Sequence, residues 1–330
     1  MRSFSYVDAY SVEEAVSALG RFGAKARINA GGTDLMGLLK DEYLPTYPEV
    51  LVNVKNIPGL DSVSEEGELL RIGALARLSE LGRSPLLLER YPALAEAAYA
   101  VASPQIRNVA TLAGNLCQDV RCAYYRYPAQ VGGAIGCARK HNGPCLAVKG
   151  DNRYHAIMGG RKCFAVCPSD TAVALAAFDA SLTVIGPHGE HSIPIADFYT
   201  PLAHRLKHGE LVIRIEVPAV SLPHQRFFKF ALRRPIDFAI VSVAVVASVE
   251  DGVCSDVRIA LGAIAPGPVR ATEAEEFLRG KPINDETASA ASELALGGVK
   301  PLGRNGYKVA IAKSLVKRGL LGEGGNLLKE

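Results

Sequence analysis

The sequence has no strong charge imbalance, no long apolar run and no disulfide framework. Its 37 Lys and Arg residues nearly balance 34 Asp and Glu residues, and a formal charge of +3 creates no field that would recruit nucleic acid or an anionic membrane. No segment approaches the roughly 18–20 uncharged apolar residues that cross a bilayer. The start, MRSFSYVDAYSVEE, lacks the apolar core of a secretory signal. We therefore expect a cytoplasmic protein with no membrane span and no nucleic-acid partner.

Several binding signatures are also missing. The glycine-rich stretches do not match G-x-G-x-x-G, and G-x-x-x-x-G-K-[ST] does not occur, so a Rossmann dinucleotide site and a P-loop are unsupported. No C-x-x-C pair is present, which excludes zinc-ribbon spacing and a thioredoxin-like redox pair. Seven cysteines in 330 residues are too few for a disulfide scaffold.

The remaining pattern predicts an α+β protein whose length suggests two or three domains. Ser11 and Glu14 have capping-box spacing ahead of an apolar helical face, and further elements alternate up to a boundary near 219–225. They are a strand through Ile28, a helix from about Thr33, a strand at 49–54, a strand and helix in 67–81, helices at 91–103 and 171–180, a hairpin at 181–195 and a strand at 210–218. Beyond the boundary come three sheet-forming segments (226–232, 237–249, 253–265) and three helices (271–279, 285–296, 305–318).

Two small-residue turns are candidate cofactor contacts. NAGGTDL, residues 29–35, lies between a strand and a helix, and its glycines let backbone N–H groups approach a phosphate or pyrophosphate. NVATLAGNLC, residues 108–117, could admit a flat ring or a diphosphate, with Thr111 and Asn115 as hydrogen-bond donors. Taken alone, the first stretch is more typical of a plain structural turn, and the second of a tight backbone crossing.

Six of the seven cysteines lie within residues 117–167, which we call the cysteine stretch. They are Cys117, Cys122, Cys137, Cys145, Cys163 and Cys167. Residues 121–163 carry eight Lys or Arg against one acid, Asp151, and such cations favour thiolates and offset the negative charge of a metal cluster. Four thiolates can hold zinc or a [4Fe–4S] cluster, and spacing does not choose between them. The alternatives are a solvated basic loop with incidental thiols or a flap that contacts RNA.

The order of five motifs carries a family resemblance. AGGTDL, IRNVATLAGNLCQ, PSDTAVALAAFDA, GELVIRIEVP and FFKFALRRPIDFAIVSVAV follow one another as in the FAD-binding medium subunit of the xanthine-oxidase family of molybdenum hydroxylases, which the chain resembles from about Phe4 to Arg318. The segment NLCQDVRCAYYR…GCARKHNGPC…GRKC resembles the loop that carries an extra [4Fe–4S] cluster in 4-hydroxybenzoyl-CoA reductase and certain bacterial aldehyde oxidoreductases. The resemblance implies an N-terminal FAD-binding subdomain at 1–55, a second one at 56–220 with the loop inserted at about 117–167, and a C-terminal α+β domain with a three-stranded sheet at 221–330.

The resemblance also implies the site residues. FAD would contact Ala30, Gly31, Gly32, Thr33, Asp34 and Leu35 at the first turn, Ala110, Thr111, Gly114, Asn115 and Leu116 at the second, and Ser169, Asp170, Ile213 and Lys229 elsewhere. The [4Fe–4S] ligands would be Cys122, Cys137, Cys145 and Cys163, with Cys167 as the substitute for the fourth because the interval from Cys145 to Cys163 is longer than in the reductase. No catalytic residue is implied.

The family implies an oxidoreductase subunit that transfers electrons. Its partners would be a large molybdenum-cofactor subunit and a small [2Fe–2S] subunit, as a dimer of heterotrimers, with NAD, ferredoxin or quinone as external carrier. The substrate would be an aromatic acyl-CoA, or alternatively an aldehyde or a heteroaromatic such as xanthine. Two other hypotheses remain: a stand-alone flavoprotein that acts on its own substrate, and a zinc-stabilised basic binding module.

Overall fold

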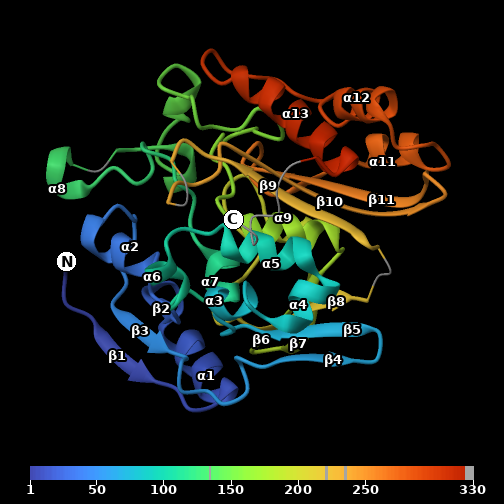
Figure 1. Ribbon diagram of the computed structural model, residues 1–330. Coiled ribbons are helices and arrows are strands. Elements are labelled where there is room, and N and C mark those ends of the chain that lie inside the picture. The colour runs from blue at the N-terminus through green and yellow to red at the C-terminus, as the bar shows by residue number, and fades with distance from the viewer. Residues whose placement is uncertain (134, 220–221, 234–235, 324–330) are drawn as a thin grey trace.

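The computed structural model describes residues 1–133, 135–219, 222–233 and 236–323. It contains three sheets, and helices follow or cover each of them (Figure 1). The predicted boundary falls partly on residues 220–221, outside the described residues. Within the described part of the chain, no helix is long and apolar enough to cross a membrane.

The N-terminal sheet is parallel, with strand order β1-β3-β2. Its strands are β1 (Ser5–Asp8), β2 (Ala26–Asn29) and β3 (Val50–Asn53), and its helices are α1 (Val12–Phe22), the 3₁₀ turn η1 (Gly23–Lys25) and α2 (Leu35–Asp41). The Ser11 hydroxyl accepts a hydrogen bond from the Glu14 N–H at 3.2 Å, and the Glu14 carboxylate reaches back to the Tyr10 N–H at 2.8 Å. The predicted start of α1 is confirmed, because the Ser11 hydroxyl satisfies an N–H group that the first helical turn leaves free, and the Glu14 carboxylate binds the chain just before the helix.

The second sheet is antiparallel and five-stranded, in the order β4-β5-β8-β6-β7. Its strands are β4 (Val63–Glu66), β5 (Leu69–Gly73), β6 (Ser181–Gly186), β7 (Gly189–Pro194) and β8 (Leu211–Pro218). The helices in this part are α3 (Leu78–Leu81), α4 (Pro85–Arg90), α5 (Pro92–Tyr99), α6 (Pro104–Arg107), α7 (Leu112–Cys117), α9 (Asp170–Ala177) and α10 (Ile195–Phe198). Every residue of α9 is buried, so this helix is the centre of the largest apolar core.

The C-terminal sheet has four strands in the order β12-β11-β10-β9, where the sequence predicted three. The strands β9 (His224–Phe230), β10 (Val241–Glu250) and β11 (Val253–Gly262) match the predicted segments, and the addition is the two-residue β12 (Val269–Arg270). So short a strand carries no periodic signal, and only its pairing with Ala260 and Leu261 defines it. The predicted helices appear as α11 (Thr272–Leu278), α12 (Asp285–Leu294) and α13 (Tyr307–Leu321) on one face of this sheet, while α5 and α9 cover the other (Figure 1).

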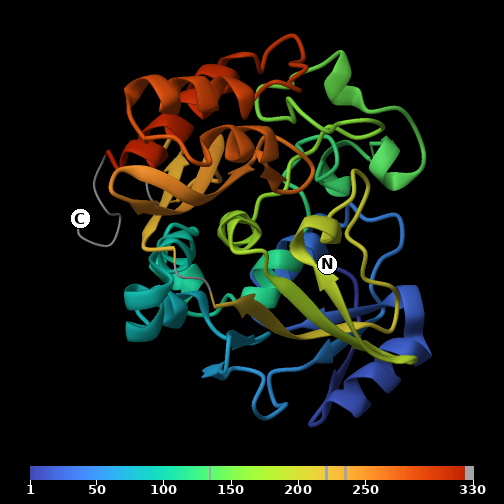
Figure 2. The same cartoon turned by 90° about the vertical axis from the view of Figure 1, so that its right-hand side faces the viewer.

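The cysteine stretch is largely irregular, with α8 (Ala129–Gly132) and the 3₁₀ turns η2 (Ala138–Lys140) and η3 (Leu146–Val148). Residues from both of its ends pack on α2 through an apolar cluster that includes Leu39, Tyr43, Tyr125, Cys137 and Cys163. Its second half is hydrogen-bonded to the C-terminal part of the chain, through Asn305 and through Lys308 of α13. The two segments lie next to each other at the top of both views (Figures 1 and 2). The stretch therefore bridges the element that follows the first glycine turn and the far end of the chain.

Candidate flavin and cysteine site

The two glycine turns contact each other directly. A Cβ atom at Gly31 would lie 2.2 Å from the Val109 carbonyl oxygen and 2.9 Å from the Ala110 Cα, so only glycine allows this approach. Gly32 has φ +70°, which also favours glycine. Within the described chain, the four N–H groups of residues 31–34 donate no hydrogen bond, so this turn presents consecutive donors of the kind that bind a phosphate.

The second turn is held by hydrogen bonds of its own. The Thr111 hydroxyl accepts from the Gly114 N–H at 3.3 Å at the start of α7, and the Asn115 side-chain oxygen accepts from the hydroxyls of Ser169 and Thr171 at 2.6 and 2.7 Å. The structure thus brings together Asn115 and Ser169, two predicted site residues 54 positions apart. Gly114 is exposed beside these buried groups, whereas Leu116 is fully buried.

Asp170 and Lys229 form a buried ion pair, with 2.7 Å between Oδ2 and Nζ. Asp170 begins α9, Lys229 lies on β9, and the Lys229 ammonium also donates to the Ala100 carbonyl at 2.8 Å. Burial raises the pKa of the Asp170 carboxyl above its ordinary value, while the Lys229 charge opposes that rise. Lys229 is therefore a buried, paired cation and not a surface lysine.

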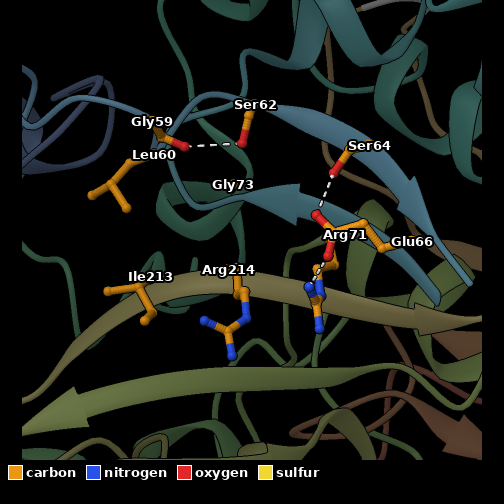
Figure 3. Close-up of a pocket in the computed structure, with 9 residues that line it drawn as sticks. All are labelled: Gly59, Leu60, Ser62, Ser64, Glu66, Arg71, Gly73, Ile213 and Arg214. Atoms are coloured by element: carbon orange, nitrogen blue, oxygen red, sulfur yellow. Dashed lines mark hydrogen bonds and ion pairs between the residues drawn. The ribbon is translucent and has the colours of Figure 1, made fainter.

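Ile213 lies at the other end of the candidate site. It packs with Ala30, Leu60 and Leu75 around the core of the N-terminal sheet. Ile213 also lines a cavity of about 350 Å³ between β5, β8 and the chain before β4. Figure 3 shows Leu60 and Ile213 together at one end of this cavity and Arg71, Glu66 and Ser64 at the other.

The side chain of Asp34 points into the cysteine stretch. Its Oδ1 is 2.8 Å from an Arg121 nitrogen and 2.7 Å from an Arg126 nitrogen, and its Oδ2 accepts from the Asp119 N–H at 2.8 Å. The Asp119 carboxylate in turn binds Arg139 at 2.9 Å and the Tyr125 hydroxyl at 2.6 Å. We call these six residues the Asp34–Asp119 network. It joins the first glycine turn to the cysteines by charged hydrogen bonds, which are stronger than neutral ones.

Four of the six clustered cysteines lie near one another. Cys145 and Cys163 interact directly, which lowers the pKa of Cys145 to about 6 and raises that of Cys163. Cys137 and Cys145 both lie close enough to Cys122 for their charges to raise its pKa, after the larger effect of burial. These four are the predicted ligands, with Cys163 as the fourth.

Cys117 and Cys167 lie elsewhere, in the core around α9 and beside Tyr199. Burial raises the pKa of Cys117 to about 12 and that of Cys167 to about 11, so both stay protonated near neutral pH. Cys167 is a buried apolar group, as is Cys254 in the C-terminal core, and Cys117 is half-buried against the core around α9.

The surroundings of the four thiols suit an iron–sulfur cluster. Backbone N–H groups of Tyr124 and Tyr125 lie at the Cys122 sulfur, others lie at Cys145, and the Ala165 N–H donates to Cys163 at 3.5 Å. Lys140 lies close to Cys122 and Cys137, so a cation faces the sulfurs. Among the described residues, no three His, Cys, Asp or Glu side chains already stand in the geometry of a single bound metal ion. The donor set itself, four sulfurs with N–H donors and a nearby cation, fits a [4Fe–4S] cluster.

Comparison with known proteins identifies the chain. Residues 2–220 match the family model for the FAD binding domain in molybdopterin dehydrogenase, and residues 226–322 match that for the CO dehydrogenase flavoprotein C-terminal domain. The aldehyde oxidoreductase FAD-binding subunit PaoB of Escherichia coli is 34% identical over 95% of this chain and 96% of its own, and the carbon monoxide dehydrogenase medium chain of Hydrogenophaga pseudoflava is 29% identical over 96% of each.

Solved structures agree with these matches. A crystal structure of quinoline 2-oxidoreductase from Pseudomonas putida 86 superposes with a TM-score of 0.76 at 28% identity, over 97% of this chain and 96% of the other. Fold and sequence together define an FAD-binding subunit of an oxidoreductase of the molybdenum hydroxylase family. Within it, the chain belongs to the medium subunits of the xanthine oxidase and carbon monoxide dehydrogenase family, so FAD is its cofactor.

Two features of the site could not be predicted from the sequence. The Asp34–Asp119 network joins residues 85 and more positions apart, and no local pattern predicts such pairs. His155 lies with its Nε2 3.3 Å from the Cys122 sulfur. The only available signal for it was a histidine inside the cysteine stretch.

Proposed function

We propose that the chain transfers electrons through FAD bound at the two glycine turns and a [4Fe–4S] cluster bound by Cys122, Cys137, Cys145 and Cys163. The observation that carries this proposal is the packing of Cys122, Cys137 and Cys163 in one cluster with α2, the helix that directly follows the first glycine turn. The fourth cysteine, Cys145, interacts with Cys163 and lies near Cys122. FAD exchanges two electrons with a diffusible carrier and one at a time with iron–sulfur centres. In this proposal the protein's residues bind, orient and tune, and none of them is catalytic.

For FAD, the four free N–H groups of residues 31–34 would hold the pyrophosphate, beside Ala110 and Thr111 of the second turn. The Asp170–Lys229 pair would contact the cofactor, and Ala30 with Ile213 would offer an apolar surface to its rings. Leu35 packs towards the cysteine stretch and keeps the two sites adjacent.

The partners would be a large molybdenum-cofactor subunit and a small [2Fe–2S] subunit in a dimer of heterotrimers, with NAD, ferredoxin or quinone as the carrier. Several relatives are named as medium chains or subunits of dehydrogenase complexes, which supports this composition. The 34% identical relative is named an aldehyde oxidoreductase subunit, and this favours an aldehyde as substrate of the complex. Reduction of an aromatic acyl-CoA is the alternative, and activity of the purified complex with either substrate decides between them.

Two buried cysteines four positions apart provide a matched test. Cys163→Ala in the purified complex should lose most of the iron and acid-labile sulfide that exceed the content of the partner subunits, and it should keep its FAD, because Cys163 contacts Cys145. Cys167→Ala should keep both, because Cys167 lies in the core around α9. Full iron in Cys163→Ala, or zinc in place of iron in the wild-type complex, would refute the proposal.

A further inference from the structure

His155 is a buried histidine whose ring contacts one of the cysteines and has no other polar partner among the described residues. The ring Nε2 lies 3.3 Å from the Cys122 sulfur. The ring Nδ1 is buried without a hydrogen-bond partner, and the whole residue is 7% exposed. The mechanism proposed above does not use this side chain.

The pattern of contacts assigns the ring proton. If Nδ1 carried the proton, a buried donor would be left unsatisfied, whereas an unprotonated Nδ1 leaves only an acceptor, which proteins tolerate better. The neutral ring therefore carries its proton on Nε2, directed at Cys122. A cysteine sulfur that binds an iron–sulfur cluster is a thiolate, and at Cys122 such a sulfur would accept this hydrogen bond.

The position of His155 is fixed from the C-terminal part of the chain. The fully buried Asn305 side chain donates from Nδ2 to the carbonyls of His155 and Ala156, both at 3.1 Å. Lys308 of α13 donates to the Tyr154 carbonyl at 3.1 Å, and the His155 N–H donates to the Asn152 carbonyl at 3.0 Å. Hydrogen bonds thus hold the backbone on both sides of the His155 ring, and they fix the position of the ring next to Cys122.

We propose that His155 is a positioning residue that donates an Nε2–H hydrogen bond to the Cys122 sulfur and raises the reduction potential of the cluster held there. This inference rests on the proposed [4Fe–4S] cluster. A donor to a ligand sulfur stabilises the reduced, more negative state, and removing it lowers the potential. Asn305 supports this hydrogen bond, because its side chain donates to the His155 carbonyl and so keeps the histidine in position.

The test is spectroelectrochemical titration of the cluster in the purified complex, with the flavin potential of the same sample as internal reference. His155→Phe should keep iron and reduce the equilibrium constant for cluster reduction about tenfold, which is about 59 mV for a one-electron couple. His155→Gln keeps an N–H donor and should restore most of the loss. The exposed His141, also in the cysteine stretch, is the matched control, and His141→Asn should leave the potential unchanged.

The outcomes separate the two proposals. A wild-type complex with no iron beyond that of the partner subunits overturns the proposed function and this inference with it. Iron present in wild type and His155→Phe, with cluster potentials that differ less than twofold in equilibrium constant, overturns the inference alone. If His155→Phe loses its iron, Asn305→Ala provides the measurement, because it keeps the His155 side chain but removes the hydrogen bonds that hold the ring next to Cys122. A lower cluster potential in Asn305→Ala supports the inference, and an unchanged one refutes it.

Discussion

Replacing Gly31 by alanine perturbs the contact on which the flavin site depends. The added Cβ would stand 2.2 Å from the Val109 carbonyl oxygen, and the two turns must separate by about 1 Å to bring the pair to an ordinary contact. Both turns are backbone at this point, so no flexible side chain can move aside. In the variant, the N–H donors of residues 31–34 therefore lie farther from Ala110 and Thr111 than they do in the wild type.

The size of the effect follows from the cost of overpacking, since insertion of one methyl group into a tight contact costs roughly 1–3 kcal/mol. In the FAD-free variant the two turns can move apart and avoid this cost. When FAD binding brings the turns together again, the cost reduces the binding free energy, and the FAD affinity falls roughly 5- to 150-fold. Gly37→Ala is the matched control, because a Cβ at this position in α2 meets nothing within 4 Å. Alanine in a helix stabilises by about 1 kcal/mol relative to glycine, so this variant should keep its FAD affinity.

The assay is titration of the FAD-free complex with FAD by flavin fluorescence, alongside urea unfolding of each variant without FAD. We expect Gly31→Ala to unfold cooperatively near the wild-type urea midpoint and to bind FAD at least fivefold more weakly. Equal FAD affinity for Gly31→Ala and Gly37→Ala, with both variants folded, would refute the assignment of this turn to the flavin.

Three further changes test the energetics around the site. Burial lowers the pKa of Lys308 from 10.5 to about 7, so the unfolded chain binds the extra proton and stability should rise between pH 7 and 10, by at most about 5 kcal/mol. Lys308→Met should flatten that rise in urea midpoints, and an identical slope would contradict the assignment. Burial raises the pKa of Glu96 from 4.5 to about 6, so the folded chain holds the proton and stability should fall by about 2 kcal/mol as pH rises from 4.5 to 6. Glu96→Gln should therefore gain stability relative to wild type above pH 6, and a difference that does not change with pH would speak against it. Asp119→Asn removes the carboxylate that pairs with Arg139, which is mostly buried, and should cost about 3 kcal/mol in chemical unfolding, whereas a loss below about 1 kcal/mol would show that the pair contributes little.

Local patterns predicted most of the fold. Apolar periodicity located α1, α9 and the long strands β10 and β11, and the capping residue Ser11 set the start of α1. The two-residue strand β12 was missed, because it exists only through pairing with β11. The helix expected from about Thr33 begins at Leu35, because residues 31–34 remain an open turn with free N–H groups.

The sequence predicted which residues form the site but not which of them contact each other. The order of the motifs predicted the glycine turns and the cysteines, whereas the contact between Gly31 and Val109 joins positions that no local pattern relates. The same holds for Asp34, which sequence alone places at the flavin but whose side chain binds Arg121 and Arg126. Such partners are chosen by tertiary packing, which a single sequence does not encode in any local period.

The most direct test of the account is the cofactor content of the wild-type complex purified without oxygen. Flavin, iron, zinc and acid-labile sulfide are measured in one sample, corrected for the centres that the partner subunits carry. The account predicts one FAD, about four iron and about four sulfide for each copy of this chain, with no zinc. Flavin without these additional iron and sulfide atoms, or zinc at the four cysteines, would contradict it.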